Sequence, residues 1–249
     1  MNSVYEPEGS IEEREIKPET EIRKRNWMPL IIFLGIVLLL IGIISGRLYI
    51  KKFTEKSDPN HYLKFQEAGM RYYEKGQFKE AEEEFEKAVE RGPDKFETHY
   101  ALGITYMSLQ RLGPAAKELI AALKLDPKHI PAHYSLGVTF QRMRKFDFAM
   151  KEYYIVIKAG HKTPQIFDNI GRIYLAQKGY DKAIYAFKRA IELNKEYLPG
   201  YISLGKAYEA QGKKEMARIE YQKVLKMASP KPELKQFAQI AEKELANLR

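Results

Sequence analysis

Apolar residues follow two different patterns along this chain. The segment Trp27–Gly46 is a run of 20 residues without a charge, whereas later in the chain apolar and charged residues alternate. In the later part Phe65, Ala68, Gly69 and Tyr72 stand at positions i, i+3, i+4 and i+7, which places them on one face of a helix. The pattern therefore predicts one fully apolar helix followed by a series of amphipathic helices.

The run Trp27–Gly46 is long enough to cross a membrane. As a helix its 20 residues span about 30 Å, the thickness of the hydrocarbon core of a bilayer. A cleaved signal peptide is the alternative, but seven acidic residues precede the run and no small-x-small cleavage site follows it. We therefore expect an uncleaved transmembrane helix between a polar tail (residues 1–26) and a linker (residues 47–61).

Basic residues on either side of the apolar run bear on its orientation. The cluster Arg23–Arg25 lies directly at its amino-terminal boundary, and basic residues tend to stay in the cytoplasm. We therefore expect a single-pass protein of the cell inner membrane, with a cytoplasmic amino terminus and the rest of the chain outside the cytoplasm. Gly42 and Gly46 form a small-xxx-small pair, which makes a weak homodimer through the span possible.

Four residue types recur every 34 positions in the remainder of the chain, without an insertion. The glycines are Gly69, Gly103, Gly137, Gly171 and Gly205. The aromatic residues three positions later are Tyr72, Tyr106, Phe140, Tyr174 and Tyr208. The alanines are Ala81, Ala115, Ala149, Ala183 and Ala217, and the large residues four positions after them are Phe85, Leu119, Tyr153, Phe187 and Tyr221. Such a fixed period predicts a repeat protein.

This pattern resembles the tetratricopeptide repeat (TPR), a 34-residue helix–turn–helix unit. The resemblance implies an all-α, superhelical solenoid of five units, which we place at residues 62–95, 96–129, 130–163, 164–197 and 198–231. Since one unit cannot bury its own apolar face, the end of the stack needs a cover. Apolar residues at helical spacing in residues 232–249 predict a capping helix there.

The repeated glycine carries a packing prediction of its own. Glycine inside a helix costs about 1 kcal/mol relative to alanine. Its recurrence in five units is therefore expected only where the second helix packs so closely that a β-carbon would clash. His99 and His133 are also 34 residues apart, and we interpret them as packing residues between units rather than metal ligands.

Candidate chemistry is sparse. The chain has no cysteine, which excludes disulfides, Cys-based zinc sites and thiol catalysis. The segment Gly200–Lys206 nearly matches a phosphate-binding loop but lacks the Ser or Thr that would hold Mg²⁺, and no strand precedes it. We therefore expect no enzyme activity, no cofactor and no metal site. The formal net charge of +9 lies on residues 62–249, a mild bias toward acidic partners.

The resemblance also implies a concave groove, lined by the first helix of each unit, that holds a peptide or a helix. Carried over by position, its residues are Met70, Tyr73, Tyr100, Ile104, Met107, Tyr134, Val138, Arg142, Asp168, Asn169, Arg172, Ile202 and Lys206. The first three units supply aromatic, aliphatic and Met side chains, and Arg142, Arg172 and Lys206 follow. We therefore expect a protein or peptide partner that is apolar at one end and acidic at the other.

These observations favour a membrane-anchored scaffold or assembly factor that binds other proteins, with a role in bacterial envelope biogenesis or secretion. A receptor for transported precursor proteins, with its repeats in the cytosol, is the alternative. Nucleic-acid binding is not expected, because the basic residues are neither clustered nor accompanied by stacking aromatic residues.

Overall fold

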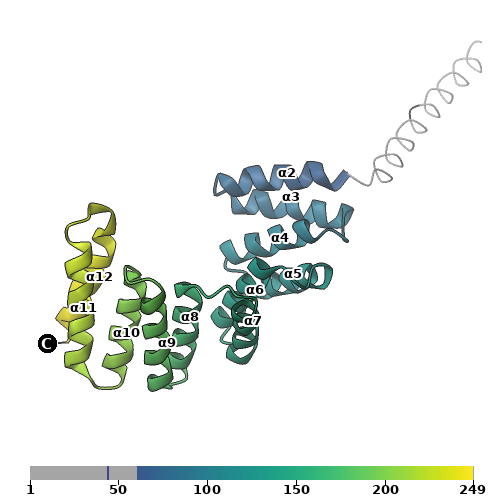
Figure 1. Ribbon diagram of the computed structural model, residues 1–249. Coiled ribbons are helices and arrows are strands. Elements are labelled where there is room, and N and C mark those ends of the chain that lie inside the picture. Colours follow the sequence, from purple (N-terminus) through teal and green to yellow (C-terminus); the bar gives the residue numbers. More distant parts are fainter. Residues whose placement is uncertain (1–43, 45–60, 249) are drawn as a thin grey trace, which may run out of the picture. The chain divides into compact units, whose positions relative to one another are not determined.

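The computed structural model describes residues 61–248 together with Ile44, and the described part is all-α, as predicted. Ten helices form five pairs, and a short 3-10 helix precedes a last helix (Figure 1). The pairs are α2 (His61–Glu74) with α3 (Phe78–Arg91), α4 (Phe96–Ser108) with α5 (Leu112–Leu125), α6 (Ile130–Arg142) with α7 (Phe146–Lys158), α8 (Pro164–Ala176) with α9 (Tyr180–Leu193), and α10 (Leu198–Ala210) with α11 (Lys214–Ala228). They are followed by η1 (Pro232–Leu234) and α12 (Lys235–Asn247).

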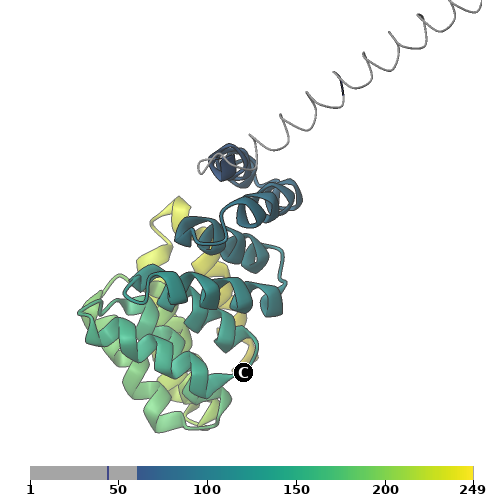
Figure 2. The ribbon, with the colours of Figure 1, turned by 90° about the vertical axis from the view of Figure 1, so that its right-hand side faces the viewer.

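Within each pair the two helices pack along the recurring residues, and successive pairs stack on one another, as the turned view in Figure 2 shows for the first units. The recurring alanines and the large residues four positions after them are all fully buried. They belong to three apolar clusters that follow one another along the array. The core is therefore divided along the stack, as expected when each unit contacts only its neighbours.

The recurring glycines lie where the two helices of a pair come closest. A β-carbon built on Gly69 would lie 2.7 Å from Phe85, and one on Gly205 would lie 2.4 Å from Tyr221 Cε1. Carbon atoms in contact prefer about 3.5–4.0 Å. The packing prediction is therefore confirmed: these positions require glycine because the facing side chain already occupies the space.

A residue with positive φ joins the two helices of every pair. It is Gly76 in the first pair and Gly212 in the fifth, but Gln110, Arg144 and Lys178 in the middle three, with φ of 62°, 59° and 60°. The left-handed region is costly for residues that carry a β-carbon. The middle turns therefore hold backbone strain that the repeat pattern does not indicate.

His99 and His133 make the same two contacts in successive units. The Nδ1 atom of His99 lies 2.7 Å from Glu118 Oε2, and its Nε2 atom lies 3.0 Å from the carbonyl oxygen of Pro93 in the preceding unit. His133 repeats this with Glu152 at 2.6 Å and the Pro127 carbonyl at 3.0 Å. Both rings are buried, so each links the helices of its own unit to the end of the unit before.

The junction between the third and fourth units differs from the others. Helices α7 and α8 approach each other less closely than the corresponding helices at the other junctions (Figure 1). Ile166 and Ile173 of α8 occupy positions that hold Thr98 and Thr105 in α4, and they are buried with Val156 of α7. Larger side chains at this contact keep the two helices further apart.

The capping helix is present. Ala238, Ala241 and Leu248 of the carboxyl-terminal segment are buried against α10 and α11. Among the residues that the structure describes, no helix is both long and apolar enough to cross a membrane. The predicted span Trp27–Gly46 and the pair Gly42 and Gly46 lie outside those residues, apart from Ile44.

Candidate binding groove

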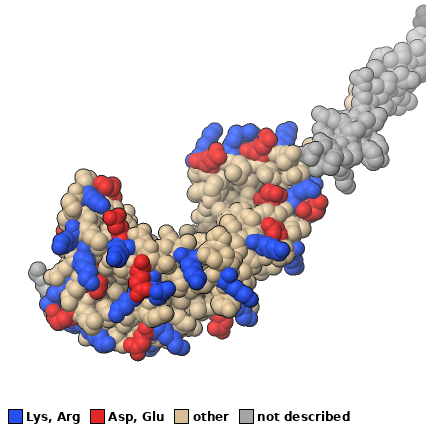
Figure 3. Space-filling model, viewed as in Figure 1, with Lys and Arg blue, Asp and Glu red and all other residues tan. Residues whose placement is uncertain are grey.

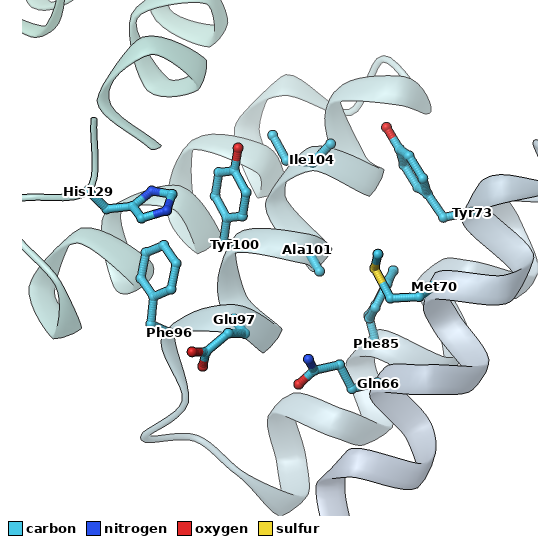
Figure 4. A pocket seen from close by; sticks show the side chains of 10 residues that line it. All are labelled: Gln66, Met70, Tyr73, Phe85, Phe96, Glu97, Tyr100, Ala101, Ile104 and His129. Atoms are coloured by element: carbon cyan, nitrogen blue, oxygen red, sulfur yellow. The ribbon is translucent and has the colours of Figure 1, made fainter. Parts of the chain in front are cut away.

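An open, mainly apolar pocket of about 420 Å³ lies between the first helices of the first two units (Figure 4). Four of the predicted groove residues line it together: Met70, Tyr73, Tyr100 and Ile104. Helices α2 and α4 carry these four residues, and Tyr73 also packs edge-on against Phe78 of α3, with ring centroids 5.2 Å apart. Met70 is 44 % exposed, and together with its neighbours it forms an exposed apolar patch rather than a single exposed side chain.

Sequence reasoning missed the rest of the lining. Gln66, Phe85, Phe96, Glu97, Ala101 and His129 also contribute. The Phe96 ring stacks on Tyr100 with centroids 5.6 Å apart and lies 4.3 Å from His129. Phe96 is the first residue of α4 but was not among the positions carried over, and His129 lies outside the first helices to which the prediction was confined. Their aromatic character was the available signal.

Two polar groups stand out in this apolar pocket. Glu97 is its only charged lining residue, and the buried side-chain oxygen of Gln66 has no hydrogen-bond partner among the described residues. Tyr73 has a partner at the pocket edge, since its hydroxyl lies 3.2 Å from Ser108 Oγ. The pocket therefore offers apolar surface with few polar groups, which is the usual composition of a ligand site.

Further along the array a hydrogen-bonded network crosses the groove. Asn169 Nδ2 donates to the Tyr134 hydroxyl at 3.4 Å, and Gln141 Nε2 donates to the Asn169 carbonyl at 3.4 Å. The Tyr153 hydroxyl donates to Gln141 Oε1 at 2.6 Å, and burial raises the pKa of Tyr153 above its usual range. These groups link the third unit to the fourth, so Tyr134 and Asn169 are held in place before any ligand arrives.

Arg172 and Lys206, the last two basic residues predicted for the groove, are paired with acidic groups. Arg172 Nε lies 2.7 Å from Asp168 Oδ2, and Lys206 Nζ lies 3.0 Å from Glu244 Oε1 of the capping helix. Arg142 differs, since its guanidinium donates to the Gln110 side chain and to the Met107 carbonyl. Within the described part of the chain, Arg142 is the predicted basic residue without a carboxylate in ion-pair distance.

The remaining predicted residues are less available to a ligand. Asp168 is 3 % exposed and Ile202 is 8 % exposed, so both side chains pack in the interior of the array. Val138 and Met107 are partly buried against the neighbouring apolar clusters.

Tyr197 lies near the buried Asp168. Burial of the Tyr197 hydroxyl, with a smaller effect from the Asp168 carboxylate, raises the pKa of Tyr197 to about 12.

The described residues contain no group of three or more His, Asp or Glu side chains arranged to hold a metal ion. His99 and His133 make the packing contacts described above, and the phosphate-loop-like run Gly200–Lys206 is part of helix α10. Its Gly205 faces Tyr221 as the fifth packing glycine. In the described part of the chain, these residues therefore contribute to packing within the array.

Comparison with known proteins agrees with the repeat pattern. A family model described as "TPR repeat" matches residues 69–110 and 171–212, and one described as "Tetratricopeptide repeat" matches residues 96–129 and 198–230. A comparison with curated protein sequences found no match.

Solved structures with the same fold include two of a protein called MamA. The first, "Crystal structure of MamA protein", has a TM-score of 0.63 and 24% identity and covers 71% of this chain and 96% of its own. The second, from Desulfovibrio magneticus RS-1, has a TM-score of 0.64 and 20% identity and covers 69% and 97%. A thermophilic TPR protein of Thermus thermophilus has a TM-score of 0.55 and 19% identity and covers 72% and 98%. The matched repeats and the shared fold show that this chain contains tetratricopeptide repeats.

Proposed function

We propose that this chain is an interaction scaffold or assembly factor whose groove binds a segment of a partner protein. The observation that carries the proposal is the apolar pocket between α2 and α4, with Met70, Tyr73, Tyr100 and Ile104 on its surface. Aromatic and Met side chains are the types enriched at protein interfaces. A large apolar side chain of the partner would fill this pocket and supply most of the binding energy.

The acidic part of the partner is proposed to bind at Arg142. A guanidinium hydrogen-bonded only to neutral groups can exchange one of them for a carboxylate. Arg172 and Lys206 would first have to leave Asp168 and Glu244, which makes them weaker candidates. The partner segment is therefore an apolar anchor followed by an acidic residue, a narrower description than the sequence alone provides.

The setting of this interaction is also a proposal. The apolar run Trp27–Gly46 would anchor the array to the cell inner membrane, with the repeats outside the cytoplasm. An anchored array that binds protein segments suits envelope biogenesis or secretion, where components have to be held together at a membrane.

Crosslinking from the pocket tests the groove. A photoreactive amino acid at Tyr100, in the full chain and in native membranes, should crosslink to one defined partner. Met70→Glu introduces a charge into the apolar pocket and should abolish that crosslink. Leu63→Glu is the matched control, because Leu63 is an exposed apolar residue of the same helix that does not line the pocket, and it should leave the crosslink unchanged.

Loss of the crosslink in both variants would point to damage to α2, which circular dichroism of the purified variants would detect. An unchanged crosslink in Met70→Glu with intact helices would contradict the proposed function. Arg142→Glu, tested in the same way, should weaken capture if the partner carries the acidic residue.

A further inference from the structure

The fourth unit exposes a face of its first helix that the second and third units bury. Three equivalent residues define this face in each unit, and it points away from the groove. They are His99, Leu102 and Tyr106 in α4, His133, Leu136 and Phe140 in α6, and Phe167, Ile170 and Tyr174 in α8. The first two sets are buried, whereas all three residues in α8 are partly exposed.

The first unit provides the explanation. Its equivalent residues Phe65, Ala68 and Tyr72 are also accessible, and no repeat unit lies before it in the described part of the chain. The face in α8 is therefore uncovered as if α7 were absent, which agrees with the wide α7–α8 junction produced by Ile166 and Ile173.

This separation leaves a cleft of about 560 Å³ between α7, α8 and α9. Its apolar lining consists of Met150, Phe167, Ile170, Tyr174, Tyr185 and Ala186. A cavity of about 150 Å³ already accepts a benzene-sized group, so the cleft has room for more than one large side chain. Tyr185 at its edge is 67 % exposed, and Phe148 and Tyr154 on α7 are 53 % and 65 % exposed.

The residue types in the cleft also differ from those in the neighbouring units. Where the second unit has the pair His99 and Glu118, the fourth has Phe167 and Ala186. A hydrogen-bonded polar pair is thus replaced by an aromatic ring and a methyl group, and both line the cleft. The wide junction makes this surface open, and the replacement of the polar pair makes it apolar. The two features involve different residues.

The excess of basic residues in the third and fourth units favours an acidic partner. Residues 130–197 contain twelve Lys and Arg against six Asp and Glu, a net charge of +6, and Figure 3 shows the basic side chains scattered over this part of the array. Lys182 lines the cleft, and in the described structure its ammonium group has no carboxylate in ion-pair distance and lies over the Tyr174 ring at 5.7 Å. Asp181 is the acidic residue in the lining of the cleft, and its carboxylate accepts a hydrogen bond from the Gln211 side chain at 2.8 Å.

From these observations we propose that the cleft between α7 and α9 is a second docking site, separate from the groove. Its occupant is an amphipathic helix of another protein, with large apolar residues on one face and acidic residues beside them. The apolar residues enter between Met150 and Tyr185, and the acidic residues face Lys182. The array would then hold two partners at once, one on each side.

The test uses a synthetic helical peptide with Leu and Phe on one face and Glu on the other. Fluorescence anisotropy would measure its binding to the full chain in mild detergent. The double variant Phe167→His, Ala186→Glu introduces the pair that the second unit already accommodates, so circular dichroism should show unchanged helix content. We expect it to weaken peptide binding at least about tenfold, and Lys182→Glu to weaken it and reduce its salt dependence.

Two controls separate this site from the groove. Met70→Glu should leave binding of this peptide unchanged, and a peptide with Lys in place of Glu should bind at least about tenfold more weakly than the acidic one. No measurable binding, equal binding to the double variant, or a preference for the Lys peptide would overturn the proposal. So would a dimer of the full chain, seen by sedimentation, that the double variant abolishes, because the cleft would then be covered by a second copy.

Discussion

Gly171→Ala tests whether the repeated glycine is a packing requirement. A β-carbon at this position would lie 2.5 Å from Phe187 Cε1 and 2.6 Å from its Cδ1, about 1 Å inside normal contact. Phe187 is fully buried, so the ring cannot move away without shifting other side chains. Overpacking of this kind costs about 1–3 kcal/mol, and alanine regains up to about 1 kcal/mol of helix propensity. We expect a net loss of about 1–2 kcal/mol in the free energy of unfolding.

Gly113→Ala is the matched control. Gly113 lies in helix α5, and nothing stands within 4 Å of the place its β-carbon would take. Because Gly113 lies in the first turn and directly precedes Pro114, alanine gains little helix propensity here, and the free energy of unfolding should change by no more than about 0.5 kcal/mol. Urea unfolding followed by circular dichroism measures both. Equal effects of the two variants, or a stabilised Gly171→Ala variant, would refute the packing argument.

The remaining predictions each concern a single turn or contact. Lys178→Gly should stabilise the chain by about 0.5–1 kcal/mol in thermal unfolding, because Lys178 has a φ of 60°, whereas Gly76→Ala should destabilise it. A double-mutant cycle with His99→Gln and Glu118→Gln should give a coupling energy of about 1–2 kcal/mol, and additive effects would show that their contact adds nothing to stability. The pKa of Tyr197 is raised to about 12 against about 10 in an unfolded chain, so its contribution to stability is complete below pH 10 and lost as the pH rises toward 12. Tyr197→Phe should therefore flatten the fall in stability over this interval and remove one tyrosine from the ultraviolet titration near pH 12.

The array was predictable because the same types of residue recur every 34 positions along the sequence. A glycine such as Gly171 recurs in every unit, and in each helix pair it faces a large residue such as Phe187. The same register places Met70 and Tyr100 in one pocket, and their role in binding a peptide stays a prediction.

Other features depend on contacts between units, which the period does not reveal. Lys206 was predicted to attract an acidic partner, but the capping helix supplies Glu244 to it. Ile202 was assigned to the groove, but it is buried in the last apolar cluster. The wide α7–α8 junction depends on the volumes of Ile166 and Ile173, which look like ordinary apolar substitutions in the sequence.

The central claim is that the groove between α2 and α4 receives a segment of a partner protein. Amide hydrogen exchange of the full chain, with and without the partner identified by crosslinking from Tyr100, tests it most directly. The account predicts slower exchange in residues 61–108 around the pocket formed by Met70 and Ile104 when the partner is bound. Protection confined to the second helices of the units, or no protection in α2 and α4, would contradict the claim.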